Sequence, residues 1–196
     1  MKIVLPIVLA LFATCVAASA AEKGQRLFSA RLSGFNEVHF NAGPPATLRG
    51  AVSTKASGSF TATLNNAGDL IDYELSYSGL EGSVTQAHIH FGQPSTVGGI
   101  IVWLCQTDTN QAPEPLNNPN ITPTCPGPNE GTVKGTITAE EVLTVNGQGV
   151  SAGEFDELVR ALRAETAYAN VHSSAFGPGE VRGQIRVGGQ GKGQGK

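Results

Sequence analysis

The sequence predicts an all-β fold: an antiparallel β-sandwich or barrel with Greek-key-like connections and one amphipathic helix. Short runs of alternating apolar and polar residues recur along the chain, as expected of strands with one buried face. The chain has 25 Gly and 11 Pro, which indicates many turns between short strands. Helical periodicity occurs in one segment, whereas a parallel α/β sheet would need several crossover helices.

The first twenty residues are set apart from the fold because they have the form of a secretory signal peptide. Lys2 precedes an apolar run from Ile3 to Val16, and Ala18-Ser19-Ala20 has the small-x-small pattern cleaved by signal peptidase. We therefore expect residues 1–20 to be removed and the protein to be secreted or periplasmic. The run is shorter than the roughly 20 residues that span a bilayer, and no later stretch comes close.

The first three strands are predicted from alternation of period two. The residues that would share one face are Phe28, Ala30 and Leu32 in the first run, Phe60, Ala62 and Leu64 in the second, and Ile71, Tyr73, Leu75 and Tyr77 in the third. Residues 65–69, NNAGD, lie between the second and third runs. Asn and Gly accept a positive φ, so this stretch predicts a hairpin.

Further strands are predicted at 84–91, at 99–105 and at 131–138. The run GIIVWLC at 99–105 is apolar enough to be buried on both faces. Residues 106–130 contain six prolines and little periodicity, which indicates a long surface loop.

The period changes once, between residues 152 and 164. Phe155, Leu158, Val159 and Leu162 recur at helical spacing, and Ser151 with Glu154 has the spacing of a capping box. Two final strands, 167–174 and 180–187, complete a single domain over 22–188. The Gly-rich tail at 189–196 cannot form a core, so we expect it to be disordered.

Two cysteines, Cys105 and Cys125, remain once the signal peptide is removed. In an oxidising compartment they would most simply form a disulfide, which closes a loop of about 20 residues and stabilises by roughly 3 kcal/mol. The alternative is a pair of soft metal ligands, which such a compartment disfavours.

The overall charge argues against two classes of partner. Without Lys2 the mature chain has 12 basic and 16 acidic residues, a net charge of −4. Nothing in this balance attracts nucleic acid or an anionic membrane. The sequence also contains no Gly-x-Ser-x-Gly elbow, phosphate loop or cysteine nucleophile, which favours a protein that is not an enzyme.

Histidines offer the main candidate for chemistry. On a strand, residues i and i+2 project to the same face, so His88 and His90 would lie side by side. His172 lies in a strand with Tyr168 and Asn170 on its own side, and it would join them if the two strands are neighbours. Three imidazoles would suit copper or zinc.

Two more residues could complete that site. His39 is the candidate for a fourth ligand, and Glu180 could ligate the metal or orient an imidazole. The alternative is that the histidines are only polar residues on a hydrogen-bonded face of the sheet.

Several motifs in order resemble the CHRD domain, named from the vertebrate protein chordin and widespread in bacterial exported proteins. They are LSGFNEV at 32–38, YELSYSGL at 73–80, AHIHFG at 87–92, LVRALRAE at 158–165 and YANVHSSAFGPGEVRGQI at 168–185. The resemblance covers 26–187 and implies an extracellular all-β module without implying a settled reaction.

The sequence therefore favours an exported, non-enzymatic CHRD-like module that binds a metal ion or a protein partner. One alternative is a mononuclear copper redox protein, oxidase-like or dismutase-like. A dinuclear copper-zinc dismutase would need about six histidines, and the chain has four. The other alternative is a structural or adhesion module of the envelope that binds no metal.

Overall fold

The computed structural model describes residues 26–41 and 47–188, so the expected signal peptide and tail lie outside the described residues. Within them the all-β prediction is confirmed. The elements are β1 (Leu27–Ser33), η1 (Gly34–Asn36), β2 (His39–Asn41), β3 (Thr47–Arg49), β4 (Ser57–Leu64), β5 (Ile71–Ser78), β6 (Val84–Phe91), β7 (Gly99–Cys105), β8 (Gly131–Ile137), η2 (Ala139–Glu141), α2 (Phe155–Arg163), β9 (Ala167–Ser173), β10 (Val181–Gln184) and β11 (Arg186–Val187).

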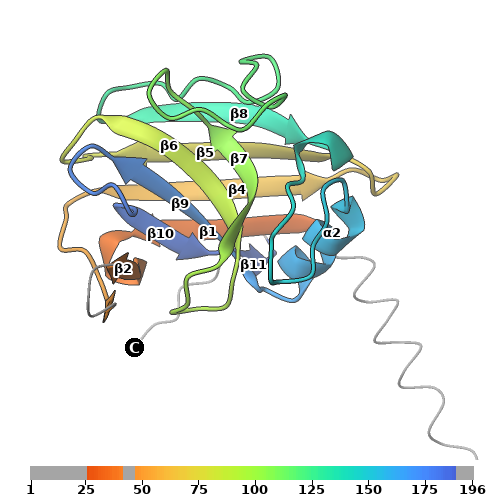
Figure 1. The fold of residues 1–196 in the computed structure, drawn as a ribbon, viewed down its shortest axis with the longest axis horizontal. Coiled ribbons are helices and arrows are strands. Elements are labelled where there is room, and N and C mark those ends of the chain that lie inside the picture. Colours follow the sequence, from red (N-terminus) through yellow and green to blue (C-terminus); the bar gives the residue numbers. More distant parts are fainter. Residues whose placement is uncertain (1–25, 42–46, 189–196) are drawn as a thin grey trace, which may run out of the picture.

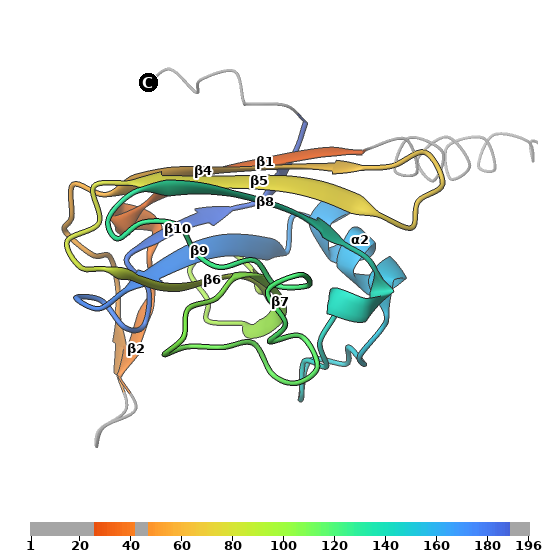
Figure 2. The same cartoon turned by 90° about the horizontal axis from the view of Figure 1, so that it is seen from above.

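One antiparallel sheet folds over on itself into a nearly closed barrel. Its strand order is β7-β6-β9-β10-β1-β4-β5-β8, with β11 paired to β1. Figure 2 shows β1, β4, β5 and β8 in one layer and β6, β7, β9 and β10 in the other. The two end strands are linked where the amide of Leu143, in the segment after β8, donates to the carbonyl of Ile101 in β7 (2.9 Å).

The core lies between these layers and follows the predicted alternation. The inward residues of β1, β4 and β5 are those that the sequence places on one face of each strand, and all of them are buried. The 65–69 hairpin is confirmed: the Asn65 side chain accepts from the amide of Gly68 (2.8 Å), whose φ of +84° suits glycine. Tyr73 crosses the core, where its hydroxyl donates to the carbonyl of Leu104 in β7 (2.6 Å).

Helix α2 covers one end of the barrel, and β2 lies at the opposite end (Figure 1). The helix begins at Phe155 rather than at 152, because Gly153 has a φ of +83° and Glu154 is the non-helical N-cap. The predicted capping box is half formed, since the Glu154 carboxylate accepts from the amide of Ser151 (2.7 Å).

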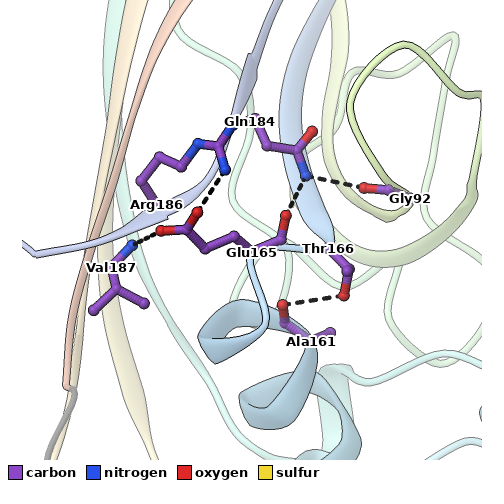
Figure 3. Close-up of polar contacts among 7 residues, drawn as sticks. All are labelled: Gly92, Ala161, Glu165, Thr166, Gln184, Arg186 and Val187. Carbon is purple, nitrogen blue, oxygen red and sulfur yellow. Dashed lines mark hydrogen bonds and ion pairs between the residues drawn. The ribbon is translucent and has the colours of Figure 1, made fainter. Parts of the chain in front are cut away.

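Glu165, just after the helix, fastens that end to the sheet (Figure 3). Its carboxylate pairs with Arg186 (2.5 Å) and accepts from the amide of Val187 (3.2 Å). The backbone carbonyl of Glu165 accepts from the side-chain amide of Gln184. The same amide also donates to the carbonyl of Gly92 (3.0 Å). The connection after β6 is thereby tied to β10.

Three details differ from the sequence prediction. The final strand is interrupted at Ile185, whose amide donates to Ala167 before β11 pairs with β1. The β2–β3 hairpin was not predicted. The prediction that β7 is buried on both faces is only partly met, since Trp103 is half-buried. The reason is that β7 lies at the end of the sheet.

The proline-rich loop is ordered by a disulfide between Cys105 and Cys125 and by one buried side chain. The Gln106 side chain donates to the carbonyls of Asn117 (2.9 Å) and Thr122 (2.8 Å) and accepts from the amide of Ala112 (3.0 Å). Together these bonds hold the loop against the end of β7. Among the helices of the described residues, none combines the length and apolar character that crossing a bilayer requires.

Removing the disulfide should destabilise the fold. The two cysteines are 20 residues apart, so replacing both by serine frees a loop whose closure is worth about 3 kcal/mol. We expect the free energy of unfolding, measured by urea denaturation under oxidising conditions, to fall by roughly that amount. Wild-type protein treated with reductant should lose a similar amount, and an unchanged midpoint in both samples would contradict the prediction.

Candidate metal centre

Pairing of β6 with β9 brings three of the four histidines together. In the antiparallel register, His88 lies opposite Asn170 and His90 opposite Tyr168, and His172 lies two residues beyond Asn170 on the same face of β9. Ala87 and Ile89 enter the core, so the two histidines of β6 face outward from the barrel. The condition under which His172 would join His88 and His90, that the two strands are neighbours, is therefore met.

The three side chains converge on one point. Each of His88, His90 and His172 offers a nitrogen, and these nitrogens all lie within 4.8 Å of one another. The ring of His88 is 5.4 Å from that of His90 and 5.0 Å from that of His172, centre to centre. Their exposed fractions are only 0%, 8% and 7%. Imidazole ligands bind zinc or copper at about 2.0 Å, so this group could hold one such ion.

Backbone carbonyls orient two of the rings. Nδ1 of His90 donates to the carbonyl of Gly98 (2.9 Å), and Nδ1 of His172 donates to the carbonyl of Gly177 (2.7 Å). A neutral imidazole that donates through Nδ1 has its lone pair on Nε2. These two bonds therefore select the tautomer that can ligate a metal through Nε2.

Several nitrogens in the cluster have no partner. Both ring nitrogens of His88 and Nε2 of His90 are buried without a hydrogen bond. Nε2 of His172 instead lies 2.9 Å from Nδ2 of Asn170, an amide whose own Oδ1 is unpartnered. Asn170 therefore occupies the lone pair of His172 and would have to turn aside when a metal binds.

Aromatic rings form the walls of the cluster. Trp103 of β7 packs edge-on against His88, with centres 4.3 Å apart. Tyr168 stacks on His90 with centres 4.7 Å apart and planes within 2°. Both contacts reduce the rotamers open to the two imidazoles, so the ligands are held before any ion arrives.

Residues 92–98 form the loop that supplies the Gly98 carbonyl. Arg182 of β10 donates to the carbonyls of Thr96 (2.7 Å) and Gln93 (3.2 Å). The amide of Gly98 donates to the Tyr168 hydroxyl (3.2 Å). Only glycine fits at 98, because a Cβ there would overlap the carbonyl of Phe91. The loop therefore lies close against the ligands.

Burial keeps the imidazoles neutral. It lowers the pKa of His88 well below its ordinary value, and the neighbouring His172 and His90 lower it further. Burial likewise lowers the pKa of His90 from 6.5 to about 4, although the bond to Gly98 opposes the shift. His172 follows the same pattern, with its bond to Gly177 opposing. Neutral imidazole is the form that ligates metals.

The other two predicted site residues lie outside the three-histidine group. Nε2 of His39 lies 2.6 Å from the carbonyl of Gly179, and its ring packs near Phe176. Glu180 is fully buried and accepts from Thr54 (2.8 Å) and from the amide of Glu81 (2.9 Å). No imidazole is among its hydrogen-bond partners in the described chain. The groups that orient the rings are instead backbone carbonyls.

Sequence reasoning missed Glu37 and Arg182 as parts of this region. Glu37 is buried, and its Oε2 has no partner. A Cβ on Gly179 would meet both that oxygen and the amide of Asn170, so Glu37 lies close behind the cluster. Burial raises the pKa of Glu37, while the bond from Val38 and the charge of Arg182 oppose this. The sequence feature that could have indicated Glu37 is its position in the NEV segment, two residues before His39.

Comparison with known proteins identifies the family. A profile of the CHRD domain matches residues 28–185, which is most of the chain. The chain belongs to the CHRD family. No curated protein and no solved structure is significantly similar to it. The CHRD match thus covers all three histidines, whereas their role has to be argued from their geometry.

The metal-free CHRD domain should lose stability in mild acid. The unfolded chain takes up a proton on His90 near pH 6.5, whereas the folded chain does so only near pH 4. Stability is thus fully present above about pH 6.5 and falls as the pH drops towards 4, by up to about 3 kcal/mol from this residue. Urea denaturation in chelator at several pH values should show this loss.

Replacing His90 by Gln provides the comparison. The variant lacks the titrating ring, so its stability should fall less steeply between pH 6.5 and 4. Parallel pH profiles for the variant and the wild type would show that His90 does not contribute.

Proposed function

We propose that this CHRD protein is an exported, non-enzymatic binding module that holds one transition-metal ion, copper or zinc, on His88, His90 and His172. The observation that carries the proposal is the set of unpartnered imidazole nitrogens inside the cluster. A buried polar atom without a partner costs roughly 1–3 kcal/mol. A metal ion would satisfy one nitrogen of His88 together with Nε2 of His90 and so remove part of that cost.

The orientation of the rings supports the same function. Two carbonyls hold His90 and His172 in the tautomer with the lone pair on Nε2, which is the outer arrangement found around histidine-ligated metals. Nε2 of His90 is unpartnered, and Nε2 of His172 becomes available once Asn170 turns aside. A polar face that served only the sheet would leave no reason for nitrogens of three rings to converge within 4.8 Å of one another. The convergence favours a ligand over the purely structural alternative.

Burial of the three histidines favours metal binding over catalysis. The rings expose no more than 8% of their surface, and Trp103 and Tyr168 pack against them. A metal here would be shielded from any large substrate. We therefore assign the module a role in holding the ion, with export resting on the signal-peptide pattern of residues 1–20.

Metal analysis tests the proposal. Protein purified without a histidine tag and exposed to copper or zinc should retain about one ion per chain after dialysis, and its melting temperature should rise, because the ion binds only the folded state. His88→Ala and His90→Gln should each abolish retention. The proposal fails if wild-type protein retains neither ion and melts at the same temperature with and without metal.

His39→Gln is the matched control. His39 lies near the cluster but outside the three-ligand group, so this variant should retain the ion. Loss of the ion in this variant as well as in the His88 and His90 variants would instead make His39 a fourth ligand.

A further inference from the structure

A buried arginine lies behind one of the three histidines. Arg182 is 2% exposed, and its guanidinium carbon lies 3.3 Å from the centre of the Tyr168 ring. His90 stacks on the same ring in parallel at 4.7 Å, and it comes from β6, which lies on the opposite side of β9 from β10. The guanidinium is fixed in place by the carbonyls of Thr96 and Gln93. A permanent positive charge thus lies close to the ligand cluster, with an aromatic ring between them.

We propose that the cluster of His88, His90 and His172 selects monovalent copper, Cu(I), over divalent ions, and that Arg182 contributes to this selection through its charge. The inference rests on the proposed metal-binding function and specifies the ion. Three features favour Cu(I): the number of ligands, their charge and the position of the guanidinium.

The number of ligands favours Cu(I). The group contains three imidazoles and no carboxylate or thiolate among the described residues. Zinc in proteins is almost always four-coordinate, so a three-histidine zinc site keeps a water or substrate in the fourth position. Here Trp103 and Tyr168 pack against the ligands and His88 is fully buried, which leaves little access for water. Cu(I) is stable with three nitrogen ligands and needs no water.

The charge of the ion acts in the same direction. Three neutral imidazoles leave the full ionic charge uncompensated, and the cost of burying an ion rises with the square of its charge. A divalent ion is therefore penalised more than a monovalent one in this enclosed cluster.

Arg182 adds to that difference. The two stacking distances place its guanidinium at most 3.3 Å plus 4.7 Å, about 8 Å, from the centre of the His90 ring. A metal on His90 would be about 8–11 Å away, where one positive charge weakens binding by roughly ten- to thirtyfold for each unit of ion charge at an effective dielectric constant near 20. The carboxyl of Glu37, which interacts with Arg182, reduces this effect when it is ionised. Cu(II) and Zn(II) carry one unit more than Cu(I).

Competition with chromophoric chelators under anaerobic conditions measures the affinities for Cu(I), Cu(II) and Zn(II). Wild-type protein should bind Cu(I) at least a hundredfold more tightly than Zn(II). Its bound copper should also stay colourless and silent in electron paramagnetic resonance on exposure to air. Arg182→Met should reduce the ratio of Cu(I) to Cu(II) affinity by about tenfold or more, which lowers the reduction potential by about 59 mV for each factor of ten.

Two further variants separate charge from structure. Arg182→Lys keeps the charge and should keep most of the ratio even if the protein melts earlier. Arg186→Gln removes an exposed arginine paired with Glu165 and should leave the ratio unchanged. The wild-type ratios and the lysine variant test the inference even if Arg182→Met does not fold.

Two results would overturn this inference while leaving the metal-binding function intact. One is tighter binding of Zn(II) than of Cu(I), and the other is the same ratio of Cu(I) to Cu(II) affinity in wild type and Arg182→Met. Absence of binding by all three ions would overturn both.

Discussion

The register of β6 against β9 is the constraint on which the rest of the site depends. It places His88 opposite Asn170 and His90 opposite Tyr168, while Ala87 and Ile89 enter the core. Because side chains alternate along a strand, a slip of one residue would turn both histidines into the apolar interior. Packing of the barrel core therefore determines that the histidines of β6 lie on the outer face of the sheet, where they form the cluster.

Burial of a polar sheet face is the consequence of this arrangement. β9 is buried along its whole length, so its outward residues Tyr168, Asn170 and His172 are covered as fully as its inward ones. Such groups are tolerated inside a protein only when they find partners. The carbonyls of Gly98 and Gly177 meet part of that need, and Arg182 holds the 92–98 loop in place to supply the first of them. The ring nitrogens in the cluster that have no hydrogen-bond partner belong to His88 and His90.

Local patterns were enough to predict the strands other than β2 and β3 and the pairing of Cys105 with Cys125, because these depend on alternation or on compartment chemistry. They left open whether His172 joins His88 and His90, because that depends on which strands are neighbours. The start of the helix at Phe155 was less accessible, since it depends on the positive φ of Gly153. Arg182 and the Gly98 carbonyl could not be predicted as partners of the site. Their contacts cross between strands and loops, and no spacing rule covers such contacts.

Three of the five motifs that resemble the CHRD family, those at 32–38, 87–92 and 168–185, acquire a common physical meaning in this structure. Glu37 of LSGFNEV, the histidines of AHIHFG, and Asn170 and His172 of YANVHSS are far apart in sequence but lie around one buried cluster. Arg182, within EVRGQI, completes it through Tyr168. An apolar core can be rebuilt with many residues of similar volume, whereas a cluster of polar groups requires particular side chains at particular positions. These three segments therefore build the candidate metal centre, whereas the motifs at 73–80 and 158–165 belong to β5 and to α2.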